Sequence, residues 1–340
     1  MIDNEITKVE LLWTRNCPLR CSYCAMATGG NNTLSIDFWK KAIDQWKKLN
    51  CGFVAIYGAE PLTEDVDKLG QAIQYMESLK IRTTVITSGC VPNFREKIQK
   101  LYDYGLRSLS MSYDILPLDK SSKAKTEKAL DNLLWFREKE DVRDAAAIAT
   151  LSRVNYKELP ESIKKLSAMN IWTFFDMIHT DRGQPGCKVK DTPLTRELLF
   201  KEEDYPELER VLKEIMDLKD QGYLCHTSKL FVEEMSKDNY QHLRNYDWHC
   251  AKEACFPSWI SVDYNGHCYP CDDFHVVDNP KIFMADKIAE EFNDFRDYYK
   301  EMSLKLCSGC CWNTHIDSNR IKEGKLAFSN YVHADVKKGE

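Results

Sequence analysis

The chain has 340 residues, of which 43% are hydrophobic and 29% are charged, and its formal net charge is −6. This composition is that of a globular protein with one large domain or two. No apolar run approaches the ~20 residues of a membrane span, and the N-terminus lacks the basic start and apolar stretch of a secretory signal. We therefore expect a cytoplasmic protein with no membrane partner. The absence of a long Lys/Arg block also argues against nucleic acid as a partner.

Short β-branched and aromatic runs alternate with amphipathic segments over the first half of the chain. These runs predict strands at 8–14, 53–57, 81–87, 106–112, 145–151 and 172–178. The spacing of apolar residues predicts intervening helices that begin at Ser35, at Thr63 and near residues 93, 122 and 158. Strands that alternate with helices imply a parallel sheet with right-handed crossovers. The expected fold class is therefore α/β, a partial (β/α)6 TIM-like barrel with its chemistry at the C-terminal ends of the strands.

Residues 181–248 break this alternation. Asp204 and Glu207 stand in the spacing of a capping box. The helix that follows has one apolar face, formed by Leu208, Val211, Ile215 and Leu218. We interpret the segment as a helical connector that contains a packing helix rather than a lid. The expected organisation is a barrel core over 1–180, the connector over 181–248 and a small C-terminal domain over 249–340.

Fourteen cysteines are many for a reducing compartment, where such residues bind metal more often than they form disulfides. Three of them, Cys17, Cys21 and Cys24, stand in C-x3-C-x2-C spacing directly after the first predicted strand. Iron–sulfur clusters that only carry electrons are usually held by four cysteines. Three thiolates leave one iron open for another ligand, as catalytic metal sites do. A zinc knuckle is the alternative, although neither a second cysteine pair nor a histidine lies near Cys17.

This stretch resembles the signature of the radical SAM (S-adenosylmethionine) enzymes. The resemblance implies that Cys17, Cys21 and Cys24 hold a 4Fe–4S cluster whose open iron is chelated by SAM. It implies that Tyr23 packs near the adenine. It also implies reductive cleavage of SAM to a 5′-deoxyadenosyl radical, which abstracts a hydrogen atom from the substrate. The electron would come from a flavodoxin- or ferredoxin-type donor.

Polar motifs follow the next three predicted strands. The Gly-Ala-Glu-Pro turn resembles the family's Gly-Gly-Glu-Pro motif, which receives the SAM amino group. An ammonium needs carbonyl and carboxylate acceptors, and Glu60 can supply the carboxylate, whereas Ala59 fits only if its φ is negative. By resemblance, the cofactor-binding residues here are Gly58, Ala59, Glu60, Pro61, Ser88, Ser112 and Asp114. For the two serines, a role as turn formers at strand ends is the alternative.

The cysteines near the C-terminus form a second pattern, Cys255-x10-Gly-x4-Cys271 followed by Cys307-x2-Cys310. Residues 263–266 have the composition of a hairpin turn, which would bring Cys255 and Cys271 together. The pattern resembles the SPASM/twitch domain attached to many radical SAM enzymes. It implies the twitch form with one auxiliary 4Fe–4S cluster, held by Cys255, Cys271, Cys307 and Cys310. A zinc ribbon is the alternative, and substitute ligands or a second cluster are left open by Cys250, Cys268 and Cys311.

For the reaction, the resemblance implies an oxidoreductase whose auxiliary cluster accepts an electron from the substrate radical, giving net oxidation. A small molecule, such as an amino sugar, is favoured as the substrate, because the predicted barrel begins near residue 8 and leaves no room for an N-terminal leader-binding domain. The alternative is a maturase that oxidises, crosslinks or epimerises a ribosomally synthesised peptide. From another class, a non-catalytic iron–sulfur or zinc-binding module is a further alternative.

Overall fold

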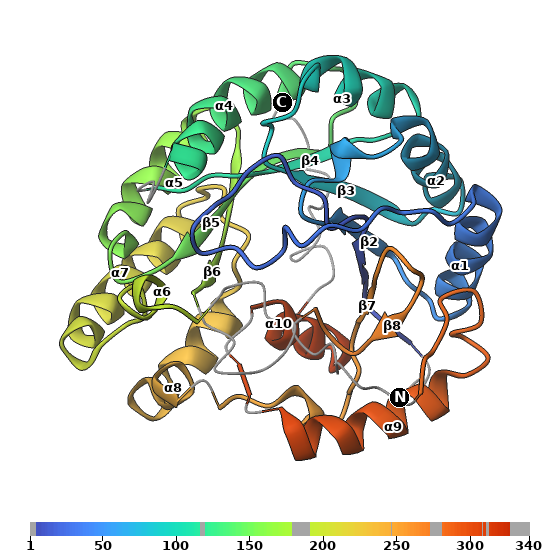
Figure 1. Cartoon of the computed structure of the whole chain (residues 1–340). Coiled ribbons are helices and arrows are strands. Elements are labelled where there is room, and N and C mark those ends of the chain that lie inside the picture. The colour runs from blue at the N-terminus through green and yellow to red at the C-terminus, as the bar shows by residue number, and fades with distance from the viewer. Residues whose placement is uncertain are drawn as a thin grey trace.

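The computed structural model describes residues 5–115, 120–178, 191–245, 247–272, 281–307, 309–310 and 313–326. Within these ranges the chain builds an eight-stranded sheet with the strand order β6-β5-β4-β3-β2-β1-β7-β8. The sheet is curved, and helices follow one another along its outer surface (Figure 1). The predicted α/β partial barrel is confirmed by this arrangement.

The first six strands and the helices between them follow the predicted alternation. The strands are β1 (Val9–Leu12), β2 (Phe53–Tyr57), β3 (Arg82–Thr87), β4 (Ser108–Ser112), β5 (Asp144–Leu151) and β6 (Trp172–Met177). The helices are α1 (Ile36–Lys48), α2 (Val66–Ser78), α3 (Phe94–Asp103), α4 (Lys120–Arg137) and α5 (Leu159–Ala168). All neighbouring pairs from β1 to β6 are parallel. The carboxyl ends of these strands therefore meet at one edge of the sheet, together with the motifs that follow them.

Large apolar side chains fill the space between the helices and the sheet. Trp39 and Trp46 of α1 are fully buried, and the ring of Trp39 lies 5.3 Å from that of Trp13, which follows β1. Leu69 and Ile73 of α2 are fully buried as well. Burying a Leu or Ile side chain contributes roughly 1.5–3 kcal/mol. The apolar helix faces predicted from spacing are therefore the surfaces that attach these helices to the sheet.

The N-terminal cap of α2 differs from the prediction. The cap is Asp65, whose Oδ1 accepts hydrogen bonds from the backbone N–H groups of Asp67 (2.9 Å) and Lys68 (3.3 Å). Thr63 instead ends a 3-10 turn over Pro61–Thr63 and donates its hydroxyl to the carbonyl of Glu60 (2.8 Å). The prediction that Thr63 caps this helix is wrong, because the chain completes this turn before the helix begins.

The connector contains α6 (Pro193–Arg196), α7 (Tyr205–Asp220) and α8 (Lys229–Asn245). The apolar face of α7 shares one core with side chains of β5 and β6. Leu208, Val211 and Ile215 are buried there beside Leu151 and Phe175. The prediction of a packing helix is therefore confirmed, and α7 covers the β5–β6 side of the barrel.

The predicted capping box at the start of α7 is wrong. The backbone of Asp204 is already helical, and its side chain makes no capping hydrogen bond to α7. Its carboxylate accepts a hydrogen bond from the N–H of Lys201 (2.8 Å) and pairs with Arg153 (3.1 Å). Asp204 therefore caps the short 3-10 turn that precedes α7, and not α7 itself.

A short hairpin joins the C-terminal segment to the barrel. β7 (Ile260–Val262) pairs antiparallel with β8 (Cys268–Tyr269) across the predicted turn at 263–266. Gly266 has a φ of +80°, and an added Cβ would lie 2.5 Å from the ring of Phe38, so glycine is required there. On its other side β7 pairs in parallel with β1. This hairpin therefore extends the barrel sheet by two strands.

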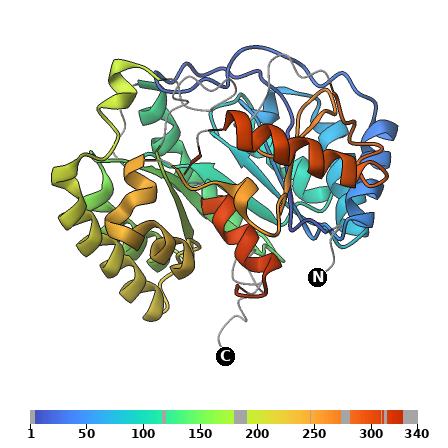
Figure 2. The ribbon, with the colours of Figure 1, turned by 90° about the horizontal axis from the view of Figure 1, so that it is seen from below.

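Two further helices, α9 (Phe292–Leu306) and α10 (Asn313–Lys322), lie on the open side of the curved sheet (Figures 1 and 2). The N–H of Asn313 donates to Asp176 of β6 (2.9 Å). The indole of Trp259, next to β7, donates to His315 (3.1 Å). α10 thus links β6, at one edge of the sheet, to the residue that precedes β7 near the other edge. No helix in the described part of the chain is long and apolar enough to cross a membrane.

Candidate active site

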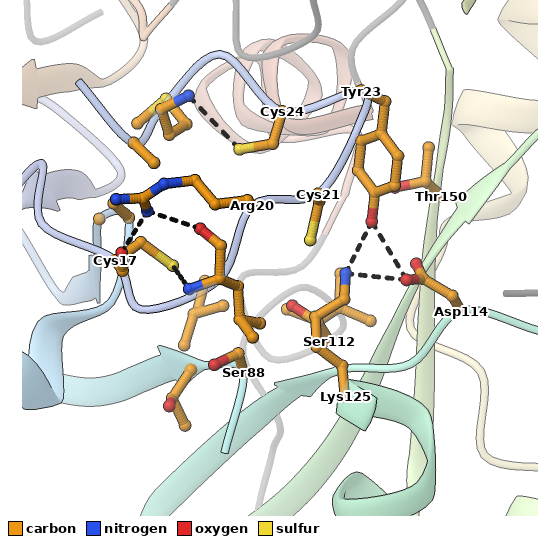
Figure 3. Close-up of a pocket in the computed structure, with 18 of the residues that line it drawn as sticks. Cys17, Arg20, Cys21, Tyr23, Cys24, Ser88, Ser112, Asp114, Lys125 and Thr150 are labelled. Carbon is orange, nitrogen blue, oxygen red and sulfur yellow. Dashed lines mark hydrogen bonds and ion pairs between the residues drawn. The ribbon is translucent and has the colours of Figure 1, made fainter. Parts of the chain in front are cut away.

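A cavity of about 390 Å³ lies at the C-terminal ends of β2, β3, β4 and β5 (Figure 3). Nine predicted residues line it: Cys17, Cys21, Tyr23, Cys24, Gly58, Ala59, Ser88, Ser112 and Asp114. Glu60 and Pro61 are buried and do not belong to the lining. Arg20 and Lys125 also line the cavity, although the sequence analysis did not single them out. The parallel sheet thus brings motifs from distant parts of the chain to one pocket.

The cysteine loop is closed at its base by backbone hydrogen bonds. The N–H of Arg15 donates to the carbonyl of Gly30 (3.0 Å), and the N–H of Gly29 donates to the carbonyl of Arg15 (3.1 Å). Beside them, the hydroxyl of Thr14 donates to the carboxylate of Glu64 (2.7 Å). Both ends of the loop are thereby held at the end of β1, which keeps the three cysteines over the pocket.

Backbone N–H groups point at two of the three loop sulfurs (Figure 3). The N–H of Leu19 lies 3.4 Å from Cys17 Sγ, and the N–H of Met26 lies 3.3 Å from Cys24 Sγ. Donors of this kind stabilise thiolates and tune the potential of an iron–sulfur cluster. Burial raises the pKa of the Cys17 thiol, and metal binding would deprotonate it. The donors and thiols present therefore fit a cluster with three protein ligands.

The three cysteines of the loop do not form a site for a single metal ion. Among the residues that the structure describes, no three His, Cys, Asp or Glu side chains stand close enough to hold one metal ion. In a cubane, each cysteine binds a different iron, so the sulfurs stand further apart than around a single ion. The absence of a single-ion site therefore does not conflict with a cubane that is bound by the three cysteines of the loop.

The turn after β2 packs directly on the start of the cysteine loop. The N–H of Ala59 donates to the carbonyl of Thr14 (3.0 Å). A Cβ added to Gly58 would lie 2.6 Å from that carbonyl oxygen, so only glycine permits this approach. The φ of Ala59 is negative, which accommodates its methyl group as the sequence analysis required. The two residues present this turn to the pocket.

Glu60 lies behind the pocket wall, fully buried, and its carboxylate is already hydrogen-bonded on both oxygens. Oε1 accepts from the Thr87 hydroxyl (2.6 Å) and from the N–H of Leu62 (3.3 Å). Oε2 accepts from the N–H of Ser88 (2.9 Å) and from its hydroxyl. Because a carboxylate offers about four lone-pair positions, all of them are used. In this structure Glu60 ties the turn after β2 to the end of β3, and a contact with the SAM amino group would require one of these bonds to be exchanged.

Tyr23 and Asp114 form a cluster with Lys125 of α4 (Figure 3). Lys125 Nζ lies 2.8 Å from Asp114 Oδ2 and donates to the Tyr23 hydroxyl (2.6 Å), which lies 3.1 Å from Asp114 Oδ2. Burial by itself lowers the pKa of Lys125, but Asp114 and Tyr23 raise it overall, so the ammonium stays charged. The cluster connects the cysteine loop to the end of β4 and to α4. Its lysine stands in a Lys-rich stretch of sequence, where no spacing distinguishes it.

The two predicted serines differ in their surroundings. The Ser88 hydroxyl is bonded to Glu60 and also accepts from the N–H of Cys90 (3.2 Å). Ser112 lies at the carboxyl end of β4, on the pocket wall opposite the cysteine loop (Figure 3). Ser88 therefore lines the pocket with a hydroxyl that is already hydrogen-bonded, whereas Ser112 is the better placed of the two for a ligand.

The predicted auxiliary cysteines fall into different surroundings. Cys310 donates its N–H to the carbonyl of Trp248 (2.9 Å), and Cys271 and Cys307 pack against the large core that includes Phe295. Cys255 lies beside α10, where its carbonyl accepts from the ammonium of Lys322 (3.3 Å). Of the spare cysteines, Cys268 is fully buried, Cys250 packs against the same core, and Cys311 lies outside the described residues.

A partial β/α barrel with a three-cysteine loop over the carboxyl ends of its strands defines the class of radical SAM proteins. Residues 11–166 match the family described as the Radical SAM superfamily. This part of the chain is a radical SAM domain. The cofactors of such a domain are SAM and a 4Fe–4S cluster, as the resemblance implied.

Two proteins whose structures were solved with S-adenosylmethionine share the fold. SuiB from Streptococcus suis, solved with S-adenosylmethionine, is 17% identical with a TM-score of 0.62, over 94% of this chain and 75% of SuiB. The protein anSMEcpe, solved with AdoMet and the Cp18Cys peptide, is 13% identical with a TM-score of 0.58, over 96% of this chain and 94% of anSMEcpe. At these identities the likeness establishes the fold alone. No curated protein matches the sequence.

Proposed function

We propose that this protein is an enzyme that reductively cleaves SAM and removes a hydrogen atom from a substrate C–H bond. The observation that carries the proposal is the meeting of the three loop cysteines and the ends of β2–β5 in one pocket. When bound, the cluster passes one electron from a flavodoxin- or ferredoxin-type donor to SAM, which yields methionine and a 5′-deoxyadenosyl radical. The protein's own part is to hold both cofactors, position the substrate hydrogen and exclude water.

The residues of the pocket divide this work. Cys17, Cys21 and Cys24 would hold the cluster, and the turn at Gly58 and Ala59 would border the methionine part of SAM. The hydrogen-bonded base of the loop keeps the cysteines in place over the strand ends. The loop itself covers the pocket (Figure 3), which is where a radical must be shielded from solvent.

Lys125 is the proposed partner of the SAM carboxylate. A lysine ammonium has three N–H donors, and Tyr23 and Asp114 use two of them. Because Lys125 lines the cavity, the third donor can serve a ligand there. A carboxylate is the group that an ammonium binds most strongly in such a setting.

The proposal is tested by the formation of 5′-deoxyadenosine. Wild type and a Cys17/Cys21/Cys24→Ala variant are reconstituted without oxygen, supplied with SAM and dithionite, and analysed for 5′-deoxyadenosine, iron and sulfide. We expect the product from the wild type and none from the variant. Cys51→Ala is the matched control, since that thiol is buried before β2, at the opposite end of the strand. Wild-type protein that binds iron and SAM without cleaving SAM would refute the proposal.

Two substrate classes are compatible with this chemistry. A small molecule is the first, and it is the class that the sequence analysis favours. A peptide side chain is the second, favoured by the fold likeness to SuiB, which was also solved with its precursor peptide SuiA, and to anSMEcpe with its peptide. Deuterium transfer from a labelled candidate into 5′-deoxyadenosine separates them, because only the true substrate delivers its label.

Net oxidation is the proposed outcome. After the hydrogen atom has left, the substrate radical would lose a proton to solvent and an electron to an auxiliary cluster in the C-terminal segment. A cluster held by four cysteines has no open site for substrate, which favours an electron-transfer role. We expect a dehydrogenated product formed in equal amount with 5′-deoxyadenosine. A product of unchanged mass would indicate epimerisation instead.

A further inference from the structure

We propose that Cys250, and not Cys255, is the fourth ligand of the auxiliary cluster, together with Cys271, Cys307 and Cys310. The inference rests on the proposed function in one respect, namely that a cluster forms in the C-terminal segment. The sequence admits both assignments, because Cys250-x15-Gly266-x4-Cys271 uses the same glycine and the same second cysteine as the pattern that starts at Cys255. The structure separates them.

Backbone contacts place the segment before Cys250 directly on the Cys307–Cys310 pair. Trp248 and Cys310 form an antiparallel β-bridge, in which the N–H of Cys310 donates to the Trp248 carbonyl (2.9 Å). His249 Nε2 lies 3.0 Å from the carbonyl oxygen of Cys307. Two successive residues that precede Cys250 are thus held against the two cysteines of the pair.

The surroundings of the Cys250 sulfur suit a cluster ligand. Its side chain packs against the large apolar core that Cys271 and Cys307 also contact, and on another side against the core around α7. The backbone N–H of Ala251 and the thiol of Cys307 are both neighbours of the Cys250 thiol. Cys307 has a similar environment, with the N–H of Gly309 3.4 Å from its sulfur. Apolar walls and backbone N–H donors are what stabilise a cluster bound by thiolates.

Cys255 lies in a different environment, at the C-terminal end of α10. Its main electrostatic neighbours are the charged side chains of Lys322, Glu323, Glu253 and Arg320. Three of these form ion pairs with one another, since Arg320 contacts Glu323 (2.9 Å) and Glu253 (3.5 Å). A cluster placed there would lie among charged side chains of both signs, and not in the apolar surroundings of Cys250, Cys271 and Cys307.

The test uses chains in which iron can bind only at the auxiliary site. In the Cys17/Cys21/Cys24→Ala background, Cys250→Ser and Cys255→Ser are compared as a matched pair. Iron and sulfide are quantified after anaerobic reconstitution, and the reduced cluster is followed by EPR. We expect the background and its Cys255→Ser form to hold equal iron, and the Cys250→Ser form to lose the cluster or to show a shifted EPR signal from oxygen ligation.

The remaining outcomes contradict the inference, and they do so distinguishably. Loss of iron from Cys255→Ser, or an unchanged signal in Cys250→Ser, refutes the assignment while the cluster itself stands. A background chain that binds no iron refutes the auxiliary cluster, and with it the oxidation proposed above. Circular dichroism melts of the two serine variants without metal serve as the folding control. If Cys250→Ser is unfolded, Cys250→Ala takes its place. An added thiolate can then supply the missing ligand, and we expect it to restore the bound iron.

Discussion

At the scale of single residues, Lys125 carries the electrostatics of the pocket. It is a buried ammonium whose charge is balanced by Asp114 at 2.8 Å and whose position is secured by the hydroxyl of Tyr23. An ammonium in such a setting is costly unless it is paired and hydrogen-bonded. The arrangement therefore gives the pocket a fixed cation close to the loop that holds the cysteines.

Lys125→Met tests this residue. Methionine is nearly as long as lysine but has no N–H donor for an anionic ligand. The substitution also leaves Asp114 without its cation. Because a hydrogen bond to a charged group contributes about 1.5–3 kcal/mol, we expect SAM to bind roughly ten to a hundred times more weakly. Equilibrium dialysis of reconstituted protein measures this. Lys128→Met on the exposed side of the same helix is the control, and equal SAM affinity in both variants would contradict the role of Lys125.

At the scale of elements, the turn after β2 depends on the loop after β3. Glu60 from the first accepts hydrogen bonds from Thr87 and Ser88 of the second, in a fully buried position. The two strand ends are therefore joined by a carboxylate as well as by the sheet. The pocket wall at Gly58 and Ala59 takes its shape from this connection.

Glu60→Gln should lower the stability of the protein even when no ligand is bound. The amide NH2 would face the donors of either Thr87 or Ser88, so at least one buried hydrogen bond is lost. We expect the free energy of unfolding to fall by about 1–3 kcal/mol, measured by urea denaturation without SAM or metal. Glu138→Gln, an exposed position in the sequence after α4, should change it little. An unaltered stability of the Glu60 variant would show that its bonds in the fold are unimportant.

At the scale of the whole molecule, α10 closes the barrel with a polar face. Asp317 is almost fully buried and accepts a hydrogen bond from the hydroxyl of Ser228, which precedes α8. Burial raises the pKa of Asp317 from its ordinary 3.8 to about 7. The contacts of Asn313 with β6 and of His315 with Trp259 complete the bridge. The closure of the barrel is therefore coupled to the protonation of one carboxyl group.

The sign of the pH effect follows from the raised pKa. Below pH 3.8 Asp317 is protonated in both the folded and the unfolded chain, so the stability that the buried, protonated carboxyl contributes is fully present. As the pH rises to about 7 the unfolded chain is ionised first, and this contribution is lost. Wild type should thus lose up to about 4 kcal/mol relative to Asp317→Asn over this window. Urea denaturation of both at pH 5 and pH 8 should show about 3 kcal/mol of this loss, because the unfolded carboxyl is already ionised at pH 5. Parallel pH profiles would contradict the prediction.

Much of the fold was predictable because its signals are local. The apolar spacing of Trp39, Ile43 and Trp46 predicts a helix with one buried face, and the structure buries all three. The two helix starts that were predicted wrongly, at Thr63 and Asp204, depend on which of several nearby polar groups reaches the free N–H groups. That choice is settled by the path of the preceding chain, which local composition does not specify.

The sequence by itself determined the cysteine motif, the strand-end positions of the other motifs and their meeting at one edge of a parallel sheet, since strand order and direction follow from the repeating β/α pattern. Tertiary structure alone decided that Lys125 reaches Tyr23 and that Glu60 is turned into the wall. It also decided that Trp248 and His249, directly before Cys250, lie against Cys310 and Cys307. These are contacts between residues distant in sequence or among equivalent candidates. Burial and direction of each side chain select between them, and both exist only once the chain has packed.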